Sequence, residues 1–335
     1  MINQHQWTNL HARLHQTLRQ RQILAKNERI LVAVSGGQDS LCMMKLLLDL
    51  QPKWLWELGM AHCDHRWLSD QGMAEHVEKI ALAWNVPFYL KIAPSPTSQD
   101  TESNPETEAA ARKWRYQALV EIAQEGKFPV IVTGHTQSDR AETLLYNLIR
   151  GSGTDGLQAL SWQRSLDDNI QLVRPLLNID RQETGELCQQ FQLPIWEDVV
   201  NKNLHYARNR MRAEVIPYLQ KHFNPQVENH LAQTSEVLKA EVDFLENLAS
   251  QLLRECVNHQ ENSLHRIKLR EHHLALQRRV IRQFLVQILP QAPNFATIEA
   301  LKNLIHAPNR SRTSSLPGGK FAEVTGDYIV IKNND

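Results

Sequence analysis

The sequence ILVAVSGGQDSLCMMKLLLDL spans residues 30–50 and places six small or polar residues between two apolar segments. The first segment, residues 30–34, is typical of a short strand buried on both faces, and the second is typical of a buried helix. A strand that ends in Ser-Gly-Gly and passes into a helix directs several backbone N–H groups and the helix N-terminus at one point. Residues 35–40 therefore predict an anion-binding loop.

The residue types of this loop suit a phosphate ligand. The two glycines permit close backbone approach, the two serines add hydroxyl groups, and Asp39 can hold Mg²⁺ facing the phosphates. The candidate phosphate-binding residues are Ser35, Gly36, Gly37, Gln38, Asp39 and Ser40. The loop lacks the lysine of a Gly-x-x-x-x-Gly-Lys-Ser/Thr loop and the spacing of a Gly-x-Gly-x-x-Gly loop. The alternative is an ordinary strand-to-helix turn.

The order of the following segments indicates an α/β fold. Apolar segments at 57–65, 86–92, 128–133 and 170–177 predict further strands, and helical periodicity separates them. A βαβαβ beginning favours a Rossmann-like parallel sheet with helices on both faces. Residues 94–108 are polar and acidic and predict a loop, and "GSGTDG" at 151–156 predicts a glycine-rich loop.

A second domain is expected after residue 220. From Pro225 the pattern becomes a long helix without strands, and three short strands are expected at the end of the chain, at 311–316, 320–325 and 328–332. We therefore expect a catalytic domain over residues 1–220 and a mainly helical domain over residues 221–335 that ends in a small antiparallel β element.

Composition narrows the class of protein. The 335 residues include 42% hydrophobic residues, no run long enough for a membrane span and no signal-peptide pattern, which indicates a cytoplasmic protein. The four cysteines form no Cys-x-x-Cys pair, so neither a zinc ribbon nor a disulfide framework is suggested.

The net charge is zero, but residues 203–225 and 264–282 are strongly basic. These segments are either solvated helix faces or a surface for nucleic acid.

Five stretches together carry a family resemblance. SGGQDS resembles the pyrophosphate loop of the N-type ATP pyrophosphatases. Four further stretches resemble the tRNA(Ile)-lysidine synthetases and follow in the same order: HCDHRWLSD (62–70), EAAARKWRY (108–116), TGHTQSDRAETLLYNLIRGSGTDGL (133–157) and EDVVNKNLHYARNRMR (197–212). The resemblance implies the fold of a PP-loop ATPase and a C-terminal domain that binds tRNA. It also implies ATP and Mg²⁺ as cofactors, and free L-lysine and a tRNA(Ile) with a CAU anticodon as partners.

The implied reaction has two steps. ATP adenylates the C2 oxygen of cytidine 34, and the side-chain amine of lysine then displaces AMP. The residues that match the family and are implied to act in the site are Asp39, Arg112, His135, Asp139, Glu142, Arg208, Asn209 and Arg212. Asp139 and Glu142 lie three residues apart in the first turn of a predicted helix, so both carboxylates share one face. The resemblance implies that this pair holds the lysine side chain. The alternative for this pair is helix capping by Asp139 and a dipole contact by Glu142.

The chain departs from the family pattern at four positions. Where the family has His-His-x-Asp-Asp-Gln-x-Glu-Thr, this sequence is HTQSDRAET, so the second His, the first Asp and the Gln are replaced. The replacing residues are Thr136, Ser138 and Arg140, and Val200 replaces a Ser before Asn201. The effect of these departures on the site is left open by the sequence.

Three other functions remain as alternatives. A tRNA thiolase would carry Cys-x-x-Cys clusters or paired catalytic cysteines, which this chain lacks. A small-molecule amide ligase fits the basic C-terminal segments less well, and a non-catalytic RNA-binding protein would not need Asp39 and the carboxylate pair. The oligomeric state is open, with a homodimer as one alternative.

Overall fold

The computed structural model describes residues 7–67, 71–94, 108–196 and 207–333. The chain divides into two compact units, Met1–Val237 and Leu238–Asp335. The division lies within one long helix, α10 (Val227–Cys256), and therefore after the expected boundary at residue 220. The expected loop at 94–108 falls almost wholly outside the described residues, as does Val200.

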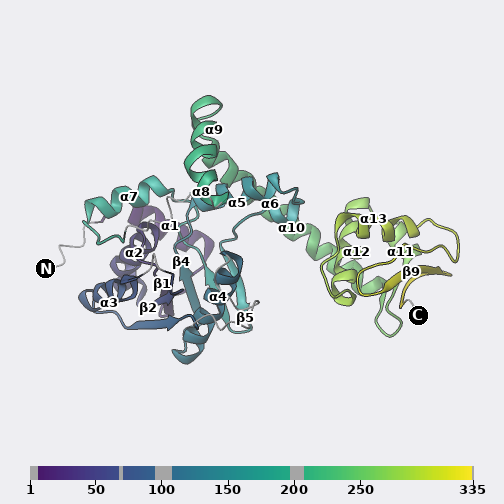
Figure 1. The fold of residues 1–335 in the computed structure, drawn as a ribbon, viewed down its shortest axis with the longest axis horizontal. Helices are drawn as coiled ribbons and strands as arrows, with labels where there is room; N and C mark the ends of the chain where they lie inside the picture. Colours follow the sequence, from purple (N-terminus) through teal and green to yellow (C-terminus); the bar gives the residue numbers. More distant parts are fainter. Residues whose placement is uncertain (1–6, 68–70, 95–107, 197–206, 334–335) are drawn as a thin grey trace. The chain divides into compact units, whose positions relative to one another are not determined.

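A six-stranded sheet forms the centre of the first unit (Figure 1). Its strands in spatial order are β3 (Phe88–Ile92), β2 (Glu57–Asp64), β1 (Arg29–Ala33), β4 (Val130–Thr133), β6 (Ile170–Val173) and β5 (Gln163–Asp167). All neighbouring pairs are parallel except β5 and β6, which are antiparallel. The mainly parallel α/β sheet is confirmed. Strand β5 was not expected, because its exposed polar residues give no alternating apolar pattern.

Helices cover both faces of this sheet, as the apolar sequence of β1 predicts. Ile30 and Val32 of β1 pack in a core with α1 (Asn9–Arg21), α2 (Gln38–Trp54), α3 (Met73–Ala83) and α7 (Arg181–Gln190). Leu31, whose side chain points to the other face, packs in a second core with α4 (Glu108–Glu125). Strand β1 is therefore buried on both sides, and the loop that follows it emerges from the middle of the sheet.

The remaining elements of the first unit lie near the end of the sheet or lead to α10. They are α5 (Gln137–Ile149), α6 (Thr154–Leu157), α8 (Ala207–Arg210), the π-helical turn Met211–Val215 (η3) and α9 (Ile216–His222). The sequence 151–156, expected to be wholly loop, contains the start of α6, so that expectation is wrong for its last residues. The described part of the basic segment 203–225 is helical from α8 through η3 to α9, and Pro217 lies in the first turn of α9.

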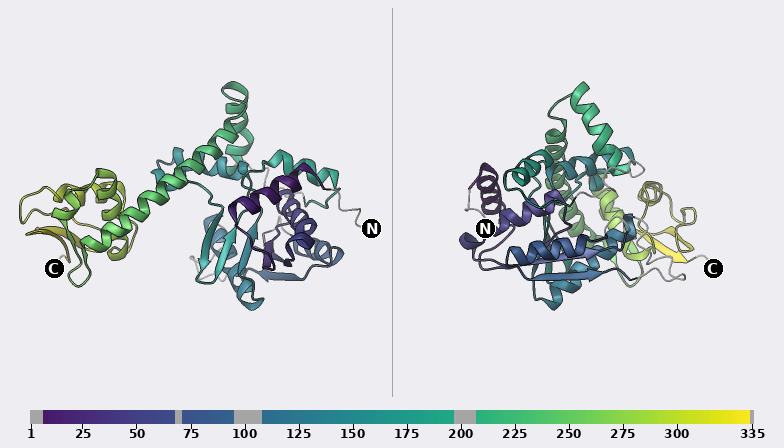
Figure 2. Two further views of the ribbon diagram at one scale, coloured as in Figure 1. Left: turned by 180° about the vertical axis from the view of Figure 1, so that it is seen from behind. Right: turned by 60° about the vertical axis from the view of Figure 1, so that its left-hand side comes forward.

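The second unit combines helices with a small antiparallel sheet (Figure 2). After α10 come β7 (Val257–Asn258), β8 (Ser263–His265), α11 (Arg266–Arg270), α12 (Leu274–Ile288), α13 (Phe295–Leu304), β9 (Lys320–Thr325) and β10 (Tyr328–Asn333). The strand order is β7-β8-β10-β9. The helical domain with a terminal antiparallel element is confirmed. The strand expected at 311–316 is wrong, since only single bridges from Arg312 and Leu316 pair there, and the very short β7 and β8 were not expected.

The described helices include none that is both long and apolar enough to cross a membrane.

Candidate active site

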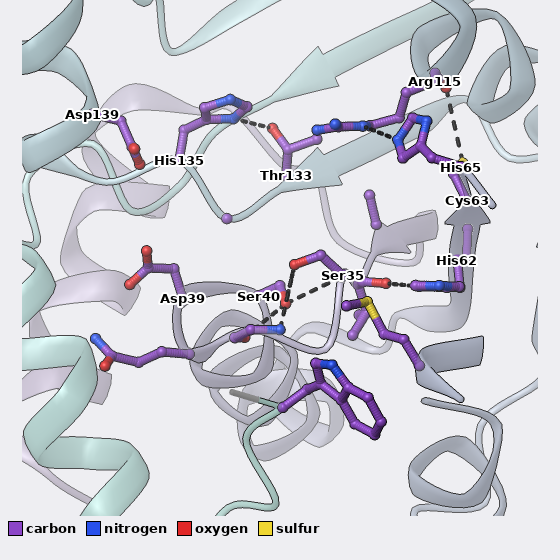
Figure 3. Close-up of a pocket in the computed structure, with 18 of the residues that line it drawn as sticks. Ser35, Asp39, Ser40, His62, Cys63, His65, Arg115, Thr133, His135 and Asp139 are labelled. Atoms are coloured by element: carbon purple, nitrogen blue, oxygen red, sulfur yellow. Dashed lines mark hydrogen bonds between the residues drawn. The ribbon is translucent and has the colours of Figure 1, made fainter. Parts of the chain in front are cut away.

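A cleft of about 560 Å³ opens at the carboxyl ends of β1, β2 and β4. The chain passes from β1 to β2 on one side, whereas β4 lies on the other side of β1, so the strand order reverses between β1 and β4. Ligands of open α/β sheets bind at such a reversal, outside the carboxyl ends of the strands. The loop after β1 and the loop after β4 both line the cleft, and their residues face one another in Figure 3.

The SGGQDS loop has the geometry of an anion-binding turn. Gly36 has φ +84°, a left-handed conformation that favours glycine, and Gly37 is the N-cap of α2. The Ser40 hydroxyl donates to the Gly37 carbonyl at 2.8 Å and accepts the Ser35 N–H at 3.2 Å. A Cβ at Gly134, after β4, would lie 3.0 Å from the Asp39 carbonyl oxygen, so the two loops meet closely there. The backbone is thus arranged to surround an anion at the start of α2.

Asp39 does not extend freely into the cleft, because two side chains of α7 bind it. Arg181 Nη2 donates to Asp39 Oδ2 at 2.7 Å, and the Thr184 hydroxyl donates to Oδ1 at 2.5 Å. Burial raises the pKa of Asp39 above its usual value, and the Arg181 guanidinium opposes this rise. Gln38 is also engaged with α7, since its amide donates to the Arg181 carbonyl at 2.7 Å and to Thr184 at 2.8 Å. The phosphate loop and α7 therefore form one hydrogen-bonded unit.

Asp139 performs the capping role and also faces the cleft. Its Oδ2 accepts the backbone N–H of Thr136 at 2.8 Å and the Thr136 hydroxyl at 3.0 Å, which makes a capping box at the start of α5. Its Oδ1 lies 3.5 Å from Arg181 Nη2 and 3.4 Å from Arg212 Nη2. Burial alone would raise the pKa of Asp139, but the Arg181 guanidinium and the hydrogen bond from Thr136 hold it below its usual value.

Glu142 and Arg212 form a two-point ion pair at the same place. Arg212 Nε donates to Glu142 Oε1 at 2.7 Å, and Arg212 Nη2 donates to Oε2 at 2.9 Å. Burial raises the pKa of Glu142, whose side chain is 4% exposed, and Arg212 opposes this rise. The structure thus brings together four residues expected from the sequence, Asp39, Asp139, Glu142 and Arg212. Arg208 and Asn209 lie half-buried in α8, one turn before Arg212.

His135 lines the cleft from the loop after β4. Its Nδ1 lies 2.9 Å from the Thr133 hydroxyl. Burial lowers the pKa of His135 to about 3, with Arg174 and Arg112 contributing in the same direction. The imidazole is therefore neutral near pH 7, when it can donate or accept a hydrogen bond but carries no charge.

Arginine side chains gather on the α4 side of the cleft, away from the carboxylates. The Arg112 guanidinium lies 5.2 Å from the centre of the Tyr116 ring, and the buried Arg174 donates to the Ser161 carbonyl at 2.8 Å. Burial alone would raise the pKa of Tyr116, but Arg112 and Arg174 lower it overall. Arg115 lines the cleft and donates to His65 Nε2 at 3.2 Å. Of these arginines only Arg115 lines the cleft, whereas on the other side Asp39 and Asp139 are paired with Arg181 and Arg212.

Arg181, Thr184 and Arg115 are site residues that the sequence did not predict. Helix α7, which carries the first two, follows Asp180, whose carboxylate caps it in a capping box with Glu183. The Asp-x-x-Glu pattern of a capping box was therefore a readable signal for α7. No local pattern indicates that the side chains of α7 bind Asp39.

Thiolate chemistry and a metal site made of protein ligands alone find little support in the described residues. Cys63 lines the cleft, but burial raises the pKa of its thiol to about 12, so it is not a reactive thiolate near pH 7. Within the described ranges no group of three or more His, Cys, Asp or Glu side chains forms a metal site. Mg²⁺ usually binds one or two carboxylates together with substrate phosphates, so Asp39, beside the phosphate loop, fits that ion.

Comparisons with known proteins agree with this geometry. A family model described as a PP-loop domain matches residues 7–219, and one described as the TilS substrate binding domain matches residues 264–324. The solved structure of the U34-tRNA thiolase NcsA from Methanococcus maripaludis, with its 4Fe-4S cluster, has a TM-score of 0.58 at 17% identity and covers 68% of this chain and 77% of that chain. This last likeness concerns the fold alone. The fold and site are those of a PP-loop ATP-binding protein.

Curated relatives extend the match to nearly the whole chain. The tRNA(Ile)-lysidine synthase of a Nostoc species is 56% identical and that of a Synechocystis species is 54% identical. The alignments cover 98% of this chain and 98% of the first relative, and 96% of this chain and 97% of the second. The chain belongs to the tRNA(Ile)-lysidine synthase family, whose members are PP-loop ATP-dependent ligases.

Proposed function

We propose that this enzyme joins lysine to C2 of cytidine 34 in a tRNA(Ile) with a CAU anticodon, which forms lysidine and releases AMP and pyrophosphate. The relatives named above are lysidine synthases of tRNA(Ile). One observation carries the proposal: the phosphate loop and Asp139 line one cleft and are joined by Arg181, and Arg212, which also lines the cleft, contacts both Asp139 and Glu142. ATP and an amine can therefore be held a short distance apart.

In the first step the loop at the start of α2 holds the pyrophosphate of ATP as the leaving group. The C2 oxygen of the cytidine attacks the α-phosphorus, and the bond to the pyrophosphate breaks. Asp39 would hold Mg²⁺, which neutralises charge on the phosphates when it is bound. The arginines of the α4 side, among them Arg112 and Arg115, give the cleft the positive charge that suits a nucleotide and an RNA backbone.

In the second step the lysine amine attacks C2, the bond from C2 to the adenylated oxygen breaks, and AMP leaves with that oxygen. The charges of the cleft suit an ammonium group. Three carboxylates, Asp39, Asp139 and Glu142, face two guanidinium groups, Arg181 and Arg212, so when Mg²⁺ is absent one negative charge remains for a cation. We assign Asp139 and Glu142 to the lysine side chain.

The amine must lose a proton before it reacts. A lysine amine has a reference pKa near 10.4, so at pH 7 only about one molecule in a few thousand is nucleophilic, a handicap of about 4–5 kcal/mol. Burial raises the pKa of Glu142 whereas the pKa of Asp139 is lowered, so Glu142 has the higher proton affinity of the pair, while both of its oxygens accept hydrogen bonds from Arg212 and Asp139 lines the cleft itself. Neutral His135 would serve as a hydrogen-bonding group beside the phosphates or the reacting oxygen.

The second unit is the proposed tRNA-binding part, and its basic surface is smaller than the sequence suggested. Arg278 Nε pairs with Glu299 at 2.6 Å, and Arg279 and Arg282 both pair with Glu246, the latter at 2.8 Å. These pairs hold half of the basic residues of 264–282 within the unit. Arg266 donates to the Gly326 and Ala307 carbonyls, and Lys268 donates to the Glu255 carbonyl. The exposed Arg270, just before α12, is therefore the best candidate of this segment for a phosphate contact.

The proposal is tested by incubating the enzyme with ATP, radiolabelled lysine and unfractionated tRNA. Label should become acid-precipitable, in parallel with AMP and pyrophosphate. Release of AMP without precipitable label would point to a different nucleophile. A methionine tRNA, which also carries a CAU anticodon, is the specificity control and should accept no label.

A further inference from the structure

The residues that replace the family motif in α5 have charged partners in α10. Ser138 is 7% exposed and Arg140 is 4% exposed, and neither lines the cleft. The partner of Ser138 is Glu228, and that of Arg140 is Glu236. Both glutamates belong to the part of α10 that lies in the first unit.

Glu228 is linked to the centre of the site through one hydroxyl group. Ser138 Oγ donates to Glu228 Oε1 and accepts the backbone N–H of Arg181 at 3.1 Å. Arg181 is the residue whose guanidinium lies between Asp39 and Asp139. An aspartate at position 138, as in the family pattern, would set a carboxylate against Glu228 and repel it.

The Glu236 carboxylate of α10 binds α5, α1 and the residue directly before β5. Its Oε2 accepts from Arg140 Nη1 at 2.7 Å and from the Trp162 indole N–H at 2.8 Å, and its Oε1 accepts from Arg21 Nη1 at 2.7 Å. The Arg140 Nε also donates to the Leu160 carbonyl at 3.0 Å. A glutamine at position 140, as in the family pattern, would remove the buried cation from this cluster.

The contacts of α10 lie on one face of the helix. Glu228, Ser235 and Glu236 are seven and eight residues apart, about two turns, and so point in one direction. The Ser235 hydroxyl donates to the Gln158 carbonyl at 2.6 Å. Hydrogen bonds and an ion pair on this face thus connect the start of α10 to α5 and to the segment after α6.

We propose that Glu228 and Glu236 are positioning residues for the carboxylates of the site, and that Ser138 and Arg140 are their matched partners. The start of α10 holds α5 and Arg181 in the arrangement that turns Asp139 and Glu142 toward the guanidinium groups. Two of the four departures from the family pattern, Ser138 and Arg140, are then each one member of a compensated pair. The consequence for lysine binding rests on the proposed function.

A double-mutant cycle in the full chain tests the first pair without any substrate. Ser138→Asp should lower the unfolding temperature by about 3–6 °C, because the introduced carboxylate still accepts the Arg181 N–H but faces Glu228. Adding Glu228→Gln should restore at least half of that loss. Glu241→Gln, at an exposed carboxylate of the same helix, is the control and should change the temperature by less than about 1 °C. A double variant no more stable than Ser138→Asp alone would overturn the pairing.

Steady-state kinetics test the positioning role through the second pair. Arg140→Gln and Glu236→Gln should each raise the KM for lysine about three- to tenfold and leave the KM for ATP within about twofold, while Arg140→Lys should recover most of the loss. An unchanged KM for lysine in both glutamine variants, or equal rises for lysine and ATP, would contradict a positioning role. A parent enzyme that transfers no lysine would contradict the proposed function instead, and the unfolding cycle would still decide the pairing.

Discussion

Arg181 donates to Asp39 at 2.7 Å although 142 residues separate them in the sequence. The same Nη2 atom lies 3.5 Å from Asp139. One guanidinium group therefore connects the loop expected to hold pyrophosphate with the helix expected to hold lysine. A change of charge at the phosphate loop therefore alters the electrostatic potential at Asp139, and the reverse also holds. This coupling suits a reaction in which pyrophosphate must leave before the amine attacks.

Replacing Arg181 should impair the adenylation step. Arg181→Gln removes the cation between two carboxylates, whose pKa values should both rise, and we expect kcat to fall about 10- to 100-fold. The measurement is tRNA-dependent AMP release over a range of Mg²⁺ concentrations. Arg181→Lys keeps the charge and should lose less. Equal activity in the parent and the glutamine variant would show that the cation has no part in the reaction.

Asp139→Asn should slow lysine transfer more than it slows adenylation. The amide cannot attract an ammonium group as a carboxylate does, so lysine transfer should fall at least about tenfold more than pyrophosphate release. Both products are followed in the same reaction, with Asp168→Asn, at an exposed position, as the control. Equal loss of both activities would argue against a lysine-specific role.

The two neutral histidines should make stability depend on pH. Burial lowers the pKa of His135 to about 3 and that of His65 to about 4, both below the usual value near 6.5. Between about pH 4 and pH 6.5 the unfolded chain binds protons that the folded chain does not, so the free energy of unfolding should rise with pH. Each histidine adds a slope of up to about 1.4 kcal/mol per pH unit.

Urea unfolding of the parent and of His135→Gln at several pH values from 4.5 to 7.5 measures this slope. The variant should show a shallower rise below pH 6.5 and the same trend above it. Identical slopes in the two proteins would mean that His135 titrates normally in the folded state.

Exposed basic residues and salt-bridged basic residues of the second unit should contribute differently to tRNA binding. Arg270 is exposed, whereas Arg282 pairs with Glu246 at 2.8 Å. Arg270→Gln should reduce the slope of log affinity against log salt by about 0.7–0.9, the value for one phosphate contact. Arg282→Gln should change the slope less and stability more. A larger change in slope for Arg282 would place the RNA on α12 instead.

The sequence predicts the parts of the site that depend on local pattern. The apolar β1, the SGGQDS turn and the spacing of Asp139 and Glu142 each follow from residues within a few positions of one another. The Arg181–Asp39 contact could not be predicted in this way, because it forms only when α7 packs beside α2. Likewise, the sequence does not explain Ser138 and Arg140, because their partners Glu228 and Glu236 lie in α10, far along the chain.

The central claim is that lysine is joined to cytidine 34 through an adenylate. The most direct measurement uses a transcript of the CAU-anticodon tRNA(Ile), radiolabelled lysine and ATP, and counts AMP, pyrophosphate and precipitable lysine. The account predicts one AMP and one pyrophosphate for each lysine incorporated, and none of the three when uridine replaces cytidine 34. Lysine incorporation into the uridine transcript, or AMP released without lysine transfer, would contradict it.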